Sequence, residues 1–103
     1  MAKTHFSHPG GILKREFLDE LNLSVSAAAQ AMAMTRARLN EIVRGERAIT
    51  ADTALRLARF FGGSAQFWMN LQSHYDLAVA ESVAKSTRSL SKIRPLSDYQ
   101  ATV

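Results

Sequence analysis

The chain of 103 residues contains no cysteine, which excludes disulfide bonds, thiol catalysis and zinc bound by cysteine. A reducing cytoplasm is therefore the expected setting. No apolar run reaches the roughly 18 residues that a membrane span needs, so we expect no membrane partner. The opening segment MAKTHFSHPG lacks the apolar stretch of a secretory signal. The length is that of one small soluble domain.

The sequence also lacks the patterns that catalysis or cofactor binding usually requires. It has no glycine-rich phosphate loop, no nucleophile elbow and no HExxH segment. The carboxylates Glu16, Asp19 and Glu20 have basic neighbours, which indicates a solvated surface rather than an acid/base pair. The histidines do not have the spacing of metal ligands and are interpreted as surface residues: His5, His8 and His74. We therefore expect no enzymatic activity, no cofactor and no metal.

Positive charge is gathered in two parts of the chain, whose net charge is +4. Residues 35–59 contain six arginines against three carboxylates. Residues 82–103 contain four basic residues against one acidic residue, whereas residues 60–81 carry two acidic charges alone. Basic clusters of this kind favour a polyanion as the partner.

Apolar residues recur every three or four positions, which predicts an all-α fold of five helices. The expected helices are residues 10–21, 25–32, 36–44, 51–61 and 65–81. Four of them follow a hydroxyl residue that can accept a hydrogen bond from a free backbone N–H, namely Ser24, Thr35, Thr50 and Ser64. We expect these helices to form one compact domain.

Each predicted helix has one apolar face that should point into a common core. In chain order, these faces contain Leu13, Phe17 and Leu21; Ala28, Ala29 and Met32; Leu39, Ile42 and Val43; Ala54, Leu57, Ala58 and Phe61; and Phe67, Trp68, Leu71, Tyr75 and Ala78. Residues 25–44 are the most informative part, because two short helices joined by a tight turn form a helix-turn-helix, a motif that binds DNA.

The second helix of this motif turns a polar face outward. Its outward side chains are Ala37, Asn40, Glu41 and Arg44, flanked by Arg36 and Arg38. Arginine can bond to guanine O6 and N7, and asparagine to adenine N6 and N7, so this face suits the major groove. Thr35 and the helix N-terminus are better suited to a phosphate. The alternative is a solvated charged face stabilised by pairs such as Glu41 with Arg44.

The fifth helix carries a second, weaker apolar stripe that one small domain would leave exposed. We interpret this stripe as a dimer interface, and its residues are Met69, Ser73, Leu77 and Ala80. Scattered surface apolar residues are the alternative. Two-fold symmetry would place paired reading helices about 34 Å apart, one turn of DNA.

The domain is expected at residues 8–81, between a flexible arm at residues 1–7 and a basic tail at residues 82–103. Serines and basic residues dominate the tail, so it should be partly disordered. Pro95 should prevent a helix nearby. The exception considered is the segment Lys92 to Leu96, which could pair as a short edge strand with another chain.

Three segments of the chain resemble the HigA-type antitoxins, within the Xre group of helix-turn-helix repressors. They are HPGGILKREFLDELNLS, RLNEIVRGERAITADTALRLARFFG and FWMNLQSHYDLAVA, and the match spans about His8 to Ala80. The resemblance implies a compact five-helix domain of the Xre/lambda-repressor-like type. It further implies a homodimer that represses its own operon at double-stranded operator DNA and neutralises a HigB-type mRNA-cleaving toxin by binding it. A stand-alone Xre repressor without a toxin partner remains the alternative.

The resemblance also implies which positions contact DNA. They are Thr35, Arg36, Ala37, Asn40 and Arg44, with Arg47 in the following loop on a phosphate. Arg38, which flanks the outward face, is also predicted to contact DNA. Two residues depart from the superfamily pattern. Val25 occupies the place of a frequent glutamine, so one contact would be missing. Ala33 replaces the usual turn glycine, and a left-handed alanine would cost about 1 kcal/mol.

Overall fold

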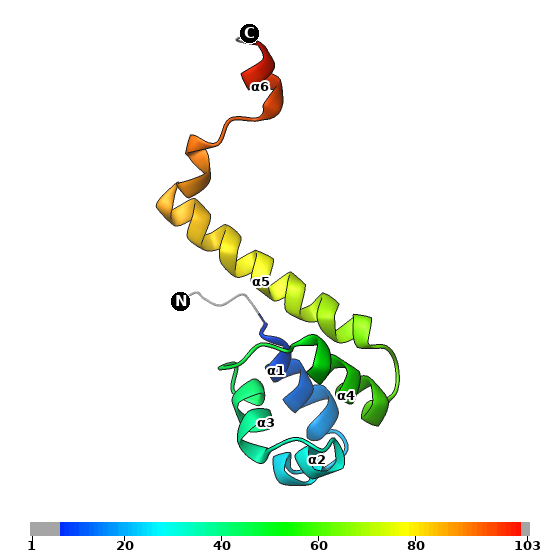
Figure 1. Cartoon of the computed structure of the whole chain (residues 1–103). Helices are drawn as coiled ribbons and strands as arrows, with labels where there is room; N and C mark the ends of the chain where they lie inside the picture. The colour runs from blue at the N-terminus through cyan, green and yellow to red at the C-terminus, as the bar shows by residue number, and fades with distance from the viewer. Residues whose placement is uncertain (1–6, 102–103) are drawn as a thin grey trace.

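The computed structural model describes residues 7–101, and every regular element in that range is helical (Figure 1). In chain order the elements are α1 (Pro9–Ile12), the π-helical segment η1 (Leu13–Leu18), α2 (Val25–Ala31), α3 (Arg36–Val43), α4 (Ala51–Phe61), α5 (Ala65–Thr87), the 3-10 segment η2 (Ser89–Lys92) and α6 (Leu96–Ala101). Because η1 continues α1 without a break, the body has the five helical segments that the sequence predicts. Within residues 7–101, no helix is long and apolar enough to cross a bilayer.

Capping explains why four of the helices begin where the sequence predicts. The hydroxyls of Ser24, Thr35 and Ser64 each accept a hydrogen bond from a backbone N–H three residues ahead, over 3.0 to 3.1 Å. Thr50 caps α4 in the same way, with a longer bond of 3.4 Å. Each bond satisfies one of the N–H groups that a helix leaves free at its start.

The first helix differs from the prediction, because it ends at Leu18 and not at Leu21. In η1 the N–H of Asp19 donates to the carbonyl of Lys14, five residues back. This wider turn changes which positions share a face. Leu13 and Leu18, five residues apart, are fully buried, whereas Leu21 is 58% exposed. Leu21 was therefore wrongly assigned to the core.

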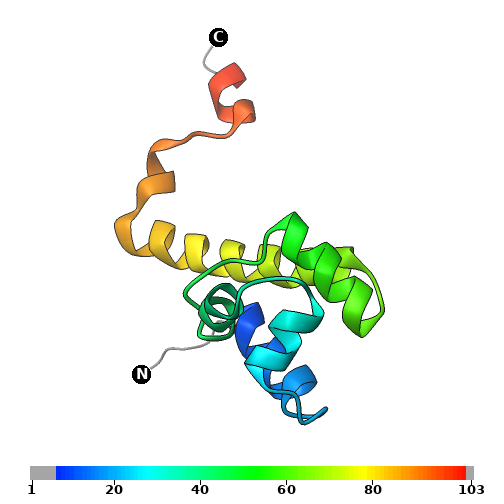
Figure 2. The same cartoon turned by 60° about the horizontal axis from the view of Figure 1, so that its bottom comes forward.

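The core lies between α1, η1, α2, α3, α4 and the first half of α5. Helix α5 crosses the body as one long rod (Figure 2). The buried apolar residues of the core are Leu13, Leu18, Ala28, Ala29, Met32, Leu39, Ile42, Ile49, Ala54, Leu57 and Trp68. Phe67 is a second correction, since it is 45% exposed and meets Trp68 edge-on at the domain surface. The buried face of α5 instead contains Trp68 and Gln72, one turn apart.

The C-terminal part of the chain extends away from this body (Figure 1). Helix α5 continues to Thr87, six residues beyond the predicted end at Glu81, and residues 82–101 also contain η2 and α6. No strand forms at Lys92 to Leu96 within residues 7–101 of the single chain, and the pairing of this segment with another chain stays a prediction. Pro95 does not prevent a helix, because it lies just before α6. Its carbonyl accepts hydrogen bonds from the N–H groups of Asp98 and Tyr99. Proline lacks an N–H, but a residue at the start of a helix does not need one.

Candidate DNA-binding surface

The turn between α2 and α3 has the backbone that the sequence predicts. Ala33 has φ +56°, so it adopts the left-handed conformation normally taken by glycine. The N–H of Met34 donates to the carbonyl of Ala29, which closes the turn directly behind α2. Ala28 and Ala29 are buried where α2 and α3 pack together. Their small side chains let the two helices approach closely.

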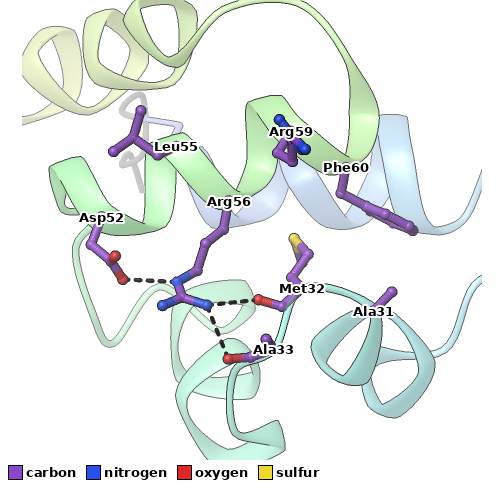
Figure 3. A pocket seen from close by; sticks show the side chains of 8 residues that line it. All are labelled: Ala31, Met32, Ala33, Asp52, Leu55, Arg56, Arg59 and Phe60. Atoms are coloured by element: carbon purple, nitrogen blue, oxygen red, sulfur yellow. Dashed lines mark hydrogen bonds and ion pairs between the residues drawn. The ribbon is translucent and has the colours of Figure 1, made fainter.

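An arginine of α4 braces this turn from outside (Figure 3). One amino group of Arg56 donates to the carbonyls of Met32 and Ala33, both at 3.0 Å. Its Nε donates to a carboxylate oxygen of Asp52 at 2.9 Å. These bonds satisfy carbonyls at the end of α2 that the helix itself leaves free. The strained turn is therefore held by a charged side chain that the sequence analysis did not single out.

Asp52 connects the brace to α3. Arg38 donates from one amino group to the Asp52 carboxylate at 2.9 Å and to the hydroxyl of Thr53 at 2.7 Å. The hydrogen bonds from Arg56 and Arg38 hold the pKa of the Asp52 carboxyl below its usual value. The carboxylate therefore stays ionised at mildly acidic pH. The guanidinium of Arg38 is directed toward α4 by these contacts.

The outward face of α3 contains the other predicted site residues. Thr35, Arg36, Ala37, Arg44 and Arg47 are exposed, and Asn40 is half-buried. Within residues 7–101, the side chains of Arg36 and Asn40 have no hydrogen-bond or ion-pair partner. An arginine and an asparagine one helical turn apart thus present free polar groups to solvent.

The ion pairs beside this face differ from the one suggested by helical spacing. Glu41 pairs with Arg47 at 2.7 Å and not with Arg44. Arg44 instead contacts Glu46 at 3.2 Å. Both pairs are exposed and join α3 to the loop that follows it. Gly45, between the two arginines, has φ +78° and begins the turn of this loop.

A buried glutamine fixes the far end of that loop. The Gln72 side-chain carbonyl accepts from the N–H of Ile49 at 2.7 Å, and its amide donates to Asp76 at 2.9 Å. Gln72 is 4% exposed and its bond with Ile49 is buried, whereas its bond to the exposed Asp76 is only partly buried. This residue was not among those predicted from the sequence. Its position one turn after Trp68, on the buried face of α5, was the available signal.

The three histidines differ in their surroundings. Among residues 7–101, no group of three His, Cys, Asp or Glu side chains is placed to hold a metal ion. His5 lies outside the described residues and His74 is exposed. His8 is half-buried rather than a free surface residue, because its Nδ1 accepts from the N–H of Gly10 and its ring meets Tyr75 edge-on. Burial lowers the pKa of the imidazole, and Asp76 partly opposes this shift.

The stripe on α5 is only partly available as an interface. Met69 is half-buried and packs against the core. Ser73, Leu77 and Ala80 are exposed, with Leu77 at 60%. Ser73 lies between Gln72 and Tyr75, where α5 packs on the body, whereas Leu77 and Ala80 lie in the second half of α5.

Known proteins match the chain over most of its length. The model of the helix-turn-helix family HTH_3 matches residues 14–68. Virulence-associated protein I of Dichelobacter nodosus is 52% identical over 90 residues, covering 87% of this chain and 81% of that protein. The structure of Pseudomonas aeruginosa antitoxin HigA with the higBA promoter has a TM-score of 0.84 at 47% identity, covering 89% of this chain and 99% of that one. An addiction module antidote protein of the HigA family from Coxiella burnetii has a TM-score of 0.81 at 38% identity, covering 89% and 99%.

Proposed function

Because the chain belongs to the HigA antitoxins within the helix-turn-helix family HTH_3, we propose that it represses its own operon and neutralises a HigB-type mRNA-cleaving toxin by binding it. The observation that carries the DNA-binding part is the outward face of α3, where the polar groups of Arg36 and Asn40 have no partner among residues 7–101. The similarity to an antitoxin whose structure was solved with its promoter supports operator DNA as the partner.

Each predicted contact residue has a role that its surroundings support. Arg36 and Asn40 are placed to read base edges, and the methyl group of Ala37 suits a thymine methyl. The exposed hydroxyl of Thr35 and the guanidinium groups of Arg44 and Arg47 suit phosphates. Arg38 was also predicted to contact DNA. Its bonds to Asp52 and Thr53 assign it to holding α3 against α4 as well.

Dimerisation is proposed through the exposed stripe of α5. The distal half of this helix has few contacts with the body, and isolated helices of that length are marginal in water. A second copy packed on Ser73, Leu77 and Ala80 would cover it. The resulting two-fold axis would present two α3 helices to half-sites about 34 Å apart.

The variant Leu77→Asp should convert the dimer into a folded monomer. An aspartate at a two-fold interface places two carboxylates near each other in a dehydrated contact, whereas in the monomer Leu77 is 60% exposed and supports no core. Light scattering measures the mass, and circular dichroism checks the helicity. Leu21→Asp, at an apolar position outside α5 that is 58% exposed, is the matched control. An unchanged mass in Leu77→Asp would remove this stripe from the interface.

The antitoxin part is tested by expressing the small reading frame adjacent to the gene, alone and together with this protein. Growth arrest by the neighbour alone, rescue on co-expression, and a complex that survives purification are the expected results. Absence of both toxicity and complex formation would leave a stand-alone Xre-family repressor. Operator binding is measured separately, on the DNA upstream of the gene, so the two parts of the proposal fail independently.

A further inference from the structure

Most arginines around the reading helix α3 are already neutralised within the chain. Of the four arginines between residues 36 and 47, Arg36 alone has no partner in the described part of the chain. Arg38 is paired with Asp52, Arg44 with Glu46 and Arg47 with Glu41. The proposed DNA-binding surface of this protein therefore has a carboxylate beside three of its four arginines.

Glu41 and Glu46 are not needed to hold the fold. Their side chains are 43% and 52% exposed, and each makes its ion pair at the surface. Exposed pairs of this kind contribute little to stability. Asp52 differs, because it also holds Arg56 on the turn. Glu41 and Glu46 nevertheless lie beside Asn40 and Arg44, where a carboxylate repels any approaching phosphate and competes with it for the arginines.

We infer that Glu41 and Glu46 are specificity-determining residues that suppress binding to DNA of arbitrary sequence. This inference rests on the proposed operator binding. Non-specific complexes depend on phosphate contacts, and without a fixed register no phosphate is held at bonding distance of Arg44 and Arg47. Arg44 and Arg47 then stay paired with Glu46 and Glu41. At the operator, base contacts fix the register, and charge-assisted bonds to phosphates replace the surface pairs.

The double variant Glu41→Gln/Glu46→Gln tests this role. Fluorescence anisotropy measures its affinity for two duplexes over a range of salt concentrations. One duplex has a random sequence, and the other contains the operator from the DNA upstream of the gene. We expect the random duplex to bind about tenfold tighter at low salt, with a salt slope steeper by roughly 1.8 because two more counterions are released. Operator affinity should rise less, so the ratio of the two affinities falls.

Glu20→Gln/Glu81→Gln is the matched control, because it makes the same change in net charge at exposed carboxylates outside α3 and its loop. It should leave both affinities and the salt slope near the wild-type values. Thermal melting checks that both variants stay folded.

Three results separate the inference from its premise. A random-duplex affinity that is equal in the test and control variants would overturn it. A loss of operator affinity alone would also overturn it and would show that Glu41 or Glu46 accepts a bond from a base, as carboxylates do from cytosine N4. Equal binding of both duplexes by the wild-type protein would instead contradict the proposed operator binding, and that comparison involves no variant.

Discussion

The double variant Arg36→Ala/Asn40→Ala should lose about 30-fold to 2 × 10⁴-fold in affinity for operator DNA, because each of the two base contacts contributes roughly 1 to 3 kcal/mol of discrimination. Both side chains project from the outward face of α3 and have no partner within the described chain. Their removal therefore breaks no contact that holds the fold. Residual binding should resemble that of random DNA, because the phosphate contacts of Thr35, Arg44 and Arg47 remain.

The measurement is the dissociation constant for the upstream duplex and for a scrambled duplex, with helicity checked by circular dichroism. Lys85→Ala/Asn70→Ala is a suitable control, because it removes the same kinds of group from exposed positions on α5. This control should retain the operator preference. If Arg36→Ala/Asn40→Ala keeps full operator affinity with normal helicity, α3 is not the reading helix.

Local signals predicted most of the helix starts and most of the core. A capping hydroxyl acts within three residues, so Ser24, Thr35 and Ser64 mark their helices in the sequence itself. The end of the first helix was missed because a π-turn has no local residue pattern of its own. In a regular α-helix the residue four positions after Leu13, Phe17, would share its buried face. The π-turn instead brings Leu18, five positions after Leu13, into full burial.

The free and the bound arginines of the site could not be separated in the same way. Arg36 and Arg38 are two residues apart and look equivalent in the sequence. The partner of Arg38 is Asp52, fourteen residues away on α4, and the brace from Arg56 to Met32 spans twenty-four residues. Contacts at such separations depend on how the helices pack. The left-handed Ala33 was predicted because it occupies the place of the usual turn glycine in the superfamily pattern.

Gly10 is the position where the packing of the body tolerates least change. A Cβ atom built on Gly10 would lie 1.7 Å from the carbonyl oxygen of Ile42, which belongs to the backbone of α3. A backbone atom cannot move aside as a flexible side chain can, so α1 and α3 would have to separate. This close approach gives a physical reason for the glycine in the HPG segment at the start of the domain.

The variant Gly10→Ala should destabilise the fold by at least about 3 kcal/mol, the upper part of the range for overpacked sites. Gly11→Ala is the matched control, because its Cβ would meet the far end of the Arg15 side chain at 3.0 Å, and that side chain can move. Alanine also favours a helix over glycine by about 1 kcal/mol, so Gly11→Ala should be neutral or slightly stabilising. The midpoint of urea unfolding measures both variants. Similar midpoints for Gly10→Ala and Gly11→Ala would show that α1 does not approach α3 this closely. Gly10 is not a DNA contact, so Gly10→Ala should weaken operator binding only by reducing the fraction of folded protein.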